Sequence, residues 1–236
     1  MNILIPMAGR GSRFLDYFKM PKPLIPINGQ PMIKLVYDNI GIVNAKYIFL
    51  VLSEHYYEYN LEYELRSFAP SCKIIVVDKV TEGAACTSLL AEDTIDNDIP
   101  LLIANSDQLV DWDSKETIKF FSQYDGGILT FKDTNPKWSF AKVKDHFVTE
   151  VAEKNPISDN ATVGMYYWKR GSDYVKYAHQ MIEKNIRTNN EFYICPVYNQ
   201  AIEDGKKIVI KEVDKMYGLG TPEDLRSYID NYIPQR

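Results

Sequence analysis

Short apolar runs alternate with segments of helical period along the first half of the chain. Runs such as Ile3–Ile5 and Tyr47–Leu52 are apolar at successive positions, which is typical of strands buried on both faces of a parallel sheet. In 31–40 the apolar residues recur at helical spacing, with Pro31 suited to a first turn and Gly41 to a helix end. The pattern predicts strands at 3–5, 47–52, 73–77, 101–104 and 127–131, with helices at 31–40, after Ser53, from about Gly83 and after Ser114.

The pattern changes after Phe131. We predict a hairpin from 141–143 and 148–152, a strand at 161–168, helices at 172–185 and 191–204, a strand at 208–213, and a last helix opened by the capping sequence Thr221-Pro222-Glu223-Asp224. Repeated strand–helix–strand units imply right-handed crossovers. We therefore expect an α/β fold with a mostly parallel central sheet flanked by helices. The change near Phe131 predicts a small lobe packed on the sheet edge, within a single domain of 1–236.

Composition and charge narrow the classes of function. The net charge of -5 argues against nonspecific nucleic-acid binding, which needs a basic face. Three cysteines far apart in the chain, Cys72, Cys86 and Cys195, have no zinc-ligand spacing and predict reduced thiols. The start is a strand and not a signal peptide, and no run approaches the roughly 20 apolar residues of a membrane span. We expect a cytoplasmic protein without membrane or nucleic-acid partners; a homo-oligomer is left open.

A glycine-rich loop follows the first predicted strand, in Pro6-Met7-Ala8-Gly9-Arg10-Gly11-Ser12-Arg13-Phe14. Its small residues allow backbone N–H groups to approach an anion, at the strand end where open α/β sheets bind ligands. A dinucleotide-binding fingerprint needs a third small residue where Phe14 stands, and a Walker loop needs Gly-Lys-Ser/Thr, which this loop lacks. The alternative is a simple tight turn.

The segment from Lys19 to Ile33 contains a lysine between two prolines. Pro21 and Pro23 restrict the backbone on both sides of Lys22 and are expected to hold it extended. A lysine on so stiff a stem is placed in advance to meet a phosphate, unless it is a solvated surface lysine.

Together, Gly-x-Gly-Ser-Arg-Phe and Pro-Lys-Pro-Leu-x-Pro-Ile resemble the signature of the sugar-phosphate nucleotidyltransferases. Weaker matches extend the resemblance over nearly the whole chain. It implies a Rossmann-like nucleotidyltransferase fold, with a nucleotide-binding half at 1–131 and an acceptor-binding half at 132–236. It also implies Mg²⁺-dependent transfer of NMP from an NTP to a phosphorylated small molecule, with release of pyrophosphate.

The resemblance assigns roles to particular residues of this sequence. Arg13, Lys22 and Asp107 are implied as catalytic, with Asp107 binding Mg²⁺ after a strand, unless Asp107 is only a turn cap. Thr81, Glu82 and Gly83 are implied to meet the base, although a helix start would also use Gly83. The residues implied to bind the nucleotide are Met7, Ala8, Gly9, Arg10, Gly11, Ser12, Arg13, Lys22, Thr81, Glu82, Gly83, Asn105 and Ser106.

For the acceptor, the resemblance implicates Glu153, Lys154, Gly164 and Tyr167, with Lys154 as the grip on the acceptor phosphate. Asn155 interrupts the family's Lys-Pro pair, and Tyr167 is equally compatible with an aromatic core strand. Gly218-Leu219-Gly220-Thr221-Pro222 resembles the family's Asp-x-Gly-Thr-Pro motif, but Gly218 replaces its Asp. Asp214 is our expected substitute as second Mg²⁺ ligand, with a plain surface role as the alternative.

The chain is similar in size to the compact cytidylyltransferases, so we favour CTP as the NTP. The expected acceptor is a sugar phosphate or another small phosphate such as choline phosphate or phosphoglutamine. A composition rich in Lys, Asn, Ile and Tyr suggests an AT-rich bacterial genome, and we therefore favour a role in surface polysaccharide or capsule precursor synthesis. Three alternatives stay open: a non-catalytic nucleotide-binding regulatory homologue, a glycosyltransferase of related fold using Asp111 and Asp113, and, disfavoured by Phe14, a dinucleotide dehydrogenase.

Overall fold

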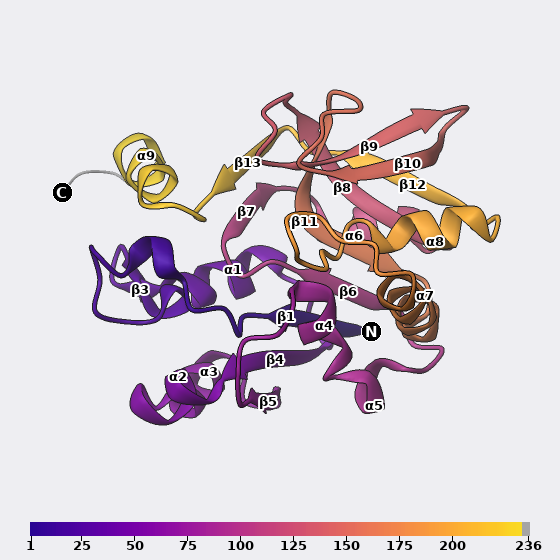
Figure 1. Ribbon diagram of the computed structural model, residues 1–236. Helices are drawn as coiled ribbons and strands as arrows, with labels where there is room; N and C mark the ends of the chain where they lie inside the picture. The colour runs from indigo at the N-terminus through magenta and orange to yellow at the C-terminus, as the bar shows by residue number, and fades with distance from the viewer. Residues whose placement is uncertain (233–236) are drawn as a thin grey trace.

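The computed structural model describes residues 1–232 and is built on a nine-stranded mixed sheet over that range (Figure 1). Its strand order is β10-β9-β11-β6-β1-β4-β5, with β8 paired to both β11 and β12. The strands are β1 (Asn2–Pro6), β4 (Lys46–Leu52), β5 (Lys73–Val77), β6 (Leu101–Ala104), β8 (Gly126–Lys132), β9 (Ser139–Lys144), β10 (Phe147–Glu153), β11 (Asn160–Trp168) and β12 (Ile208–Glu212).

The first half of the sheet is parallel, as the alternation of strands and helices predicts. β1 pairs in parallel with both β4 and β6, and β4 pairs in parallel with β5. The second half mixes directions, because β11 runs antiparallel to β6 and β8, whereas β12 runs parallel to β8. The expected hairpin is β9 and β10. The α/β fold with a mixed, mostly parallel sheet is confirmed.

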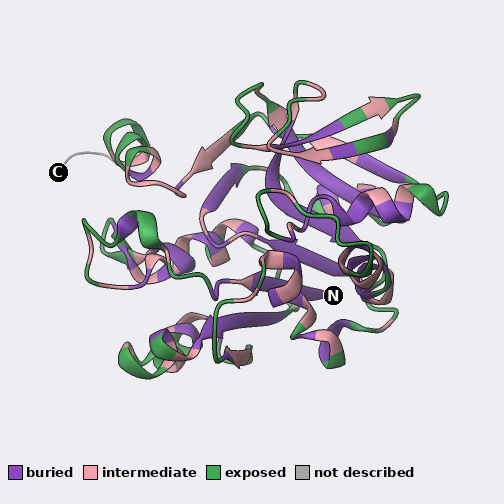
Figure 2. Cartoon of the chain, in the orientation of Figure 1, coloured by how far each residue is buried: buried purple, intermediate pink, exposed green. Residues whose placement is uncertain are grey.

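Helices cover both faces of the sheet, and the alternation of side chains along β1 shows why. Ile3 and Ile5 belong to one buried cluster and Leu4 to another, since successive side chains of a strand point to opposite faces. Burial is concentrated in the strands and the inward sides of the helices (Figure 2). The helices are α1 (Met32–Ile40), α2 (Ser53–Glu58), α3 (Leu61–Phe68), α4 (Ala84–Leu89), α5 (Glu92–Ile95), α6 (Ser114–Phe121), α7 (Gly171–Glu183), α8 (Val197–Glu203) and α9 (Pro222–Tyr232).

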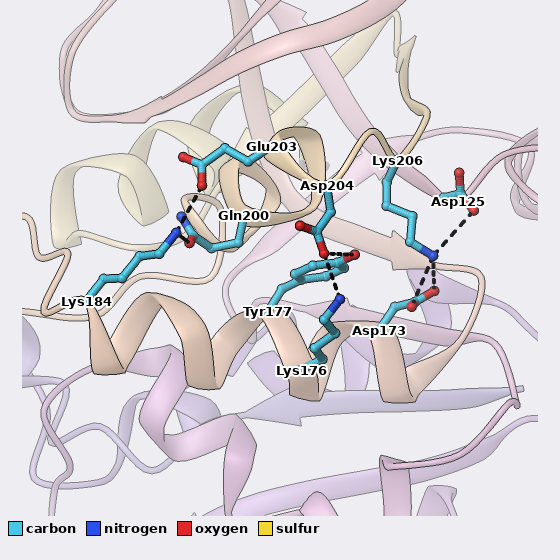
Figure 3. Close-up of polar contacts among 9 residues, drawn as sticks. All are labelled: Asp125, Asp173, Lys176, Tyr177, Lys184, Gln200, Glu203, Asp204 and Lys206. Atoms are coloured by element: carbon cyan, nitrogen blue, oxygen red, sulfur yellow. Dashed lines mark hydrogen bonds and ion pairs between the residues drawn. The ribbon is translucent and has the colours of Figure 1, made fainter.

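Polar contacts join α7 to α8 and the turn after it (Figure 3). Lys176 Nζ on α7 lies 2.7 Å from Asp204 Oδ2, and the Tyr177 hydroxyl donates to the same oxygen at 3.2 Å. Lys184 Nζ donates to Gln200 Oε1 at 2.5 Å. These contacts fix the two helices against the face of the sheet that carries Leu4.

Several predicted helices are shorter or broken. The helix after Ser53 is interrupted at Asn60, whose φ of 48° leaves the helical region, so α2 and α3 are separate. The helix expected at 191–204 begins only at Val197, because residues before it form an irregular loop. Ser114 does not cap α6: the Asp113 carboxylate accepts from the Glu116 N–H at 2.8 Å.

The structure contains a two-stranded ribbon that the hydrophobic pattern of the sequence does not predict. β7 (Gln108–Asp111) and β13 (Lys215–Gly218) pair antiparallel, with Gly218 opposite Gln108. Each strand has only four residues, too few to show a period. The ribbon brings the Gly218–Gly220 segment beside Asp107, and the Leu219 N–H donates to the Asp107 carbonyl at 2.8 Å.

No helix within residues 1–232 combines the length and apolarity needed to cross a membrane.

Candidate active site

A lysine and an aspartate from distant parts of the chain meet where β1 and β6 end. Lys22 Nζ donates to Asp107 Oδ2 at 2.6 Å, although 85 positions separate them in the sequence. Each side chain is 19% exposed, so the pair is largely shielded from solvent. Water screens such a pair less than an exposed one. The positively charged Lys22 ammonium is therefore held at the Asp107 carboxylate, which the resemblance implies as a metal ligand.

Lys22 is placed by a short 3₁₀ turn, not by extended backbone as we expected. The turn η2 covers Lys22–Leu24, and the Ile25 N–H donates to the Lys22 carbonyl at 3.1 Å. Pro21 is extended, with φ of -56° and ψ of 139°. Pro23 fits the turn because its fixed φ is also a 3₁₀ value and the first residues of a helix need no N–H donor. The two prolines restrict the backbone around Lys22, as expected, but they do so in a 3₁₀ turn and not in an extended conformation.

The glycine-rich loop packs directly against this lysine. Gly11 has a φ of 63° and precedes the 3₁₀ turn η1 (Ser12–Phe14). A Cβ at position 11 would lie 2.9 Å from the Lys22 Cβ, closer than side chains tolerate. Glycine is thus needed for both backbone conformation and space. Loop and lysine form one unit, and Lys22 does not point into bulk solvent.

The remaining loop residues divide into buried and exposed sets. Met7 and Ala8 are buried, whereas Gly9 and Ser12 are exposed. Arg10 points away from Asp107: its Nε lies 3.9 Å from Glu54 Oε1, and it lines a separate cavity of about 340 Å³ beside His55. The structure therefore does not bring Arg10 to the main cavity.

The main cavity has a volume of about 540 Å³ and lies between the two halves of the sequence. Its walls come from the loop after β1, the end of β6, the ribbon β7–β13, the β9–β10 hairpin, β11 and the irregular loop before α8. It is lined by Arg13, Ala84, Asn105, Asp107, Gln108, Lys137, Trp138, Ser139, Glu153, Lys154, Thr162, Gly164, Tyr166, Glu191, Tyr193, Ile194, Cys195, Gly218, Gly220, Thr221 and Asp224.

Ala84 lines this cavity, but the three residues before it, 81–83, do not. Gly83 has a φ of 136°, and a Cβ there would lie 2.4 Å from the Phe192 carbonyl oxygen. The Thr81 hydroxyl donates to the Gly83 carbonyl at 2.9 Å, and Glu82 pairs with Arg187 at 2.7 Å. This segment is fastened to the loop before α8, and none of its three residues lines the main cavity.

The segment after β6 contributes Asn105 but not Ser106, which is buried behind the cavity wall. Asn105 Nδ2 donates to Gln108 Oε1 at 3.2 Å. Gly164, with a φ of 75° at an irregularity in β11, leaves room for this pair, since a Cβ there would lie 2.0 Å from Gln108 Oε1. The predicted residues Asn105 and Gly164 thus form one wall together.

On the acceptor side, Lys154 and Glu153 both line the cavity as predicted. Lys154 Nζ donates to the Tyr193 hydroxyl at 2.6 Å and lies 4.7 Å from the centre of that ring. Glu153 accepts a hydrogen bond from the Ser139 hydroxyl. Burial raises the pKa of the Glu153 carboxyl, against the opposing effects of Ser139 and the Lys154 charge.

Tyr167, which the resemblance implies as an acceptor-site residue, does not line the cavity and instead fits the alternative of an aromatic core strand. It is 1% exposed and stacks on Phe121, in the core on the far face of the sheet. Tyr166 lines the cavity instead, with its hydroxyl 3.0 Å from Thr162 Oγ1. The two tyrosines point to opposite faces because they are adjacent on β11. The resemblance placed the aromatic side chain one position too far along the strand.

Asp214 does not join Asp107. It is exposed beyond the end of β12 and does not line the cavity. Asp224, on the first turn of α9, does line it, and its Oδ1 lies 3.1 Å from Lys137 Nζ. Within residues 1–232, no three His, Cys, Asp or Glu side chains converge as metal ligands do.

The carboxylates that the glycosyltransferase alternative needs lie outside the cavity. Asp113 is occupied as the cap of α6, and Asp111 is exposed at the end of β7. Phe14 is 1% exposed in the core, so the loop turns there instead of opening a long dinucleotide-binding helix. Neither alternative finds support in this geometry.

Sequence reasoning missed Lys137, Trp138, Tyr193 and Asp224. The first two lie in the connection before β9, and Tyr193 lies in the loop that we predicted as helix. Asp224 was noticed only as part of a capping sequence. A basic and aromatic pair next to a predicted hairpin is the one local signal that could have indicated this wall, and by itself it is weak.

Solved structures share this fold over their whole length. The chain resembles the nucleoside-diphosphate-sugar pyrophosphorylase from Vibrio cholerae, with a TM-score of 0.85 and 24% identity over 97% of this chain and 100% of that one. It also resembles a glucose-1-phosphate thymidylyltransferase from Bacillus anthracis, with a TM-score of 0.80 and 19% identity, covering 100% and 97% of the two chains. The inositol-1-phosphate CTP transferase from T. maritima gives a TM-score of 0.74 at 14% identity, covering 99% and 98%.

Among curated relatives, the chain is 24% identical over 231 residues to the bifunctional protein GlmU of Methanocaldococcus jannaschii, which covers 95% of this chain and 52% of that protein. The chain spans about half the length of this relative, or less for the GlmU of Methanococcus aeolicus, of which 39% is covered. A sequence model of the nucleotidyl transferase family matches residues 3–233. The chain therefore belongs to the nucleotidyl transferase family.

Proposed function

We propose that the chain transfers NMP from an NTP to a phosphorylated small molecule and releases pyrophosphate. One observation carries the proposal: a single cavity is lined by Arg13 and Asp107, which pairs with Lys22, and also by Lys154 and Tyr193. The first group suits a triphosphate and the second the phosphate of an acceptor.

The chemistry needs charge placement more than a strong base. An oxygen of the acceptor phosphate attacks the α-phosphorus of the NTP, and the bond from that phosphorus to the β-phosphate oxygen breaks. Pyrophosphate leaves with that bond's electron pair, and the acceptor becomes a diphosphate-linked product. The attacking oxygen is already anionic, so no proton has to be removed. Arg13 and Lys22 are our candidates for neutralising the charge that develops on the phosphates.

The residues present fit a divalent cation such as Mg²⁺. The Asp107 carboxylate already holds the ammonium of Lys22 at 2.6 Å, and Gly220 leaves space beside it, since a Cβ there would lie 3.1 Å from Oδ2. Mg²⁺ is usually bound by one or two carboxylates, with phosphates and water as the other ligands. When bound, it would neutralise phosphate charge; Asp107 would hold it.

The acceptor wall offers a cation and hydrogen-bonding groups. Lys154 and Tyr193 suit an acceptor phosphate, and the Glu153 carboxylate with the Tyr166 hydroxyl suits hydroxyl or amide donors on the rest of the acceptor. We propose a sugar phosphate, or another small phosphate such as choline phosphate or phosphoglutamine. CTP is our first candidate NTP, on the resemblance to compact cytidylyltransferases. We further propose a cytoplasmic role in bacterial surface polysaccharide or capsule precursor synthesis.

Two measurements test the proposal. Thermal shift with CTP, UTP, dTTP, GTP and ATP, each with Mg²⁺, should single out one nucleotide; ligand at 100 times its Kd adds ~2.7 kcal/mol of stability. Pyrophosphate release is then measured with that nucleotide and a panel of phosphorylated acceptors. Release that needs both substrates is expected. Nucleotide binding without release by any acceptor would favour the regulatory homologue, to which Gly218 gives some support. Absence of any nucleotide binding would end the proposal.

A further inference from the structure

Position 218 lacks the carboxylate that the family resemblance implies, and the structure places another carboxylate beside it. We propose that Asp224 supplies the second carboxylate of the divalent-cation site, together with Asp107. This inference rests on the proposed function, because the cation in question is the one that accompanies the NTP.

The two glycines of the Gly218–Gly220 segment each face one carboxylate. A Cβ at position 220 would lie 3.1 Å from Asp107 Oδ2. A Cβ at position 218 would lie 3.7 Å from Asp224 Cγ and 3.8 Å from its Oδ2. A carboxylate carried on residue 218 would therefore occupy the space next to the one that Asp224 already presents. Asp107 and Asp224 both line the same cavity.

Each of these carboxylates is paired with a lysine ammonium. Lys22 Nζ lies 2.6 Å from Asp107, and Lys137 Nζ lies 3.1 Å from Asp224 Oδ1. The two ammonium groups together carry two positive charges. One divalent cation would balance the same two carboxylates. Exchange of the ammoniums for the cation keeps the charge of the site unchanged. It also releases Lys22 and Lys137 to contact phosphate oxygens, which are the ligands that arrive with the cation.

The backbone holds Asp224 at this place. Its N–H donates to Thr221 Oγ1 at 3.1 Å, which fixes the first turn of α9, and its side chain is 24% exposed. The Leu219 N–H bond to the Asp107 carbonyl at 2.8 Å ties the segment before α9 to the other carboxylate. The relative position of the two acids is thus set by the ribbon β7–β13 and the start of α9, and not by a loop free to move.

Binding of Mn²⁺ tests the assignment without relying on turnover. Free Mn²⁺ is titrated by electron paramagnetic resonance with the full-length protein, alone and with the NTP that gives the largest thermal shift. Asp224→Asn should weaken Mn²⁺ binding by at least about tenfold, as loss of a metal-supporting group does. Glu223→Gln, which removes one exposed charge from the same helical turn, is the matched control and should leave the affinity unchanged.

A rescue variant separates ligation from a merely structural role of Asp224. Gly218 is not in the left-handed region, and the nearest atom to a Cβ there is Trp138 Cη2 at 3.5 Å, an ordinary contact. G218D in the Asp224→Asn background should therefore restore most of the Mn²⁺ affinity. Thermal melting of each variant establishes that it is folded.

The outcomes are distinct from those of the proposed function. Wild-type affinity in Asp224→Asn, an equal loss in Glu223→Gln, weakening by Asp214→Asn instead, or no Mn²⁺ binding by the wild type in either condition would each overturn the assignment. Failure of G218D to rescue a folded Asp224→Asn variant would also overturn it. Pyrophosphate release by the wild type in any of these cases would leave the nucleotidyltransferase proposal standing.

Discussion

The ammonium of Lys22 lies 2.6 Å from the carboxylate of Asp107, a residue that lines the same cavity as Arg13. The pair joins the two motifs that sequence analysis singled out separately. A cation at this carboxylate is therefore already part of the ligand-free protein. Nucleotide binding then means a change of partners for two charges and not the filling of an uncharged site.

Lys22→Met should have two effects of opposite sign. Turnover should fall by about 10²–10³, the cost of losing one electrostatic donor in a reaction of this class. Binding of Mn²⁺ in the absence of nucleotide should become tighter, because the competing ammonium at Asp107 is gone. Pyrophosphate release and Mn²⁺ titration measure the two effects.

Lys19→Ala is the control for Lys22→Met, since Lys19 is an exposed lysine of the same segment and lines only the second cavity. Its turnover and metal affinity should match the wild type. Wild-type rates in a folded Lys22→Met variant would remove Lys22 from the mechanism.

Asp107→Asn should weaken the Mg²⁺ dependence of both nucleotide binding and turnover. The amide keeps the shape of the side chain but loses the charge that attracts a divalent cation. Titrating Mg²⁺ while following NTP binding by thermal shift gives the readout. Asp111→Asn, in an exposed position outside the cavity, should behave as the wild type. An unchanged Mg²⁺ titration for Asp107→Asn would exclude Asp107 as a ligand.

Gly11→Ala should destabilise the protein by about 1 kcal/mol or more, since a side chain is strained at φ of 63° and must displace the Lys22 Cβ, 2.9 Å away. Urea unfolding measures the loss, and turnover should fall with it because Lys22 moves. Gly9→Ala is the matched variant: position 9 has nothing within 4 Å of a Cβ, so its unfolding midpoint should be unchanged. Equal stability of the two variants would contradict this account of the loop.

Glu153→Gln should stabilise the protein in a pH-dependent way. Burial raises the pKa of the Glu153 carboxyl, so folding favours the protonated form. The cost of burying the anion is therefore absent below the ordinary pKa of 4.5, grows as the pH rises from there towards the higher pKa of the folded protein, and is constant above it.

Thermal melting from about pH 4 to about pH 8 should show a Tm advantage of Glu153→Gln over the wild type that is present at high pH and shrinks towards low pH. Glu150→Gln, on an exposed position of the same strand, controls for the loss of one negative charge. An advantage that is the same at every pH would mean that packing, and not ionisation, is responsible.

Local pattern was sufficient for the fold class, and it singled out the glycine-rich loop and the Pro-Lys-Pro segment. Apolar runs and helical spacing are local properties, and they identified the core strands β1, β4 and β6 because such strands are buried whatever packs on them. The glycine-rich loop and the Pro-Lys-Pro segment likewise carry their chemistry within a few residues. The catalytic roles of Arg13, Lys22 and Asp107 are implied by the family resemblance and stay predictions; the structure shows that Lys22 and Asp107 meet.

The acceptor side was decided by tertiary structure. Whether Tyr166 or Tyr167 faces the cavity depends on which side of β11 is turned towards it, and a sequence of adjacent aromatic residues does not tell the two faces apart. Asp224, and not Asp214, meets the cavity because the four-residue strands β7 and β13 pair and carry the start of α9 across the sheet edge. The pairing of β7 with β13 joins residues about a hundred positions apart in the sequence, and no short-range periodicity predicts it.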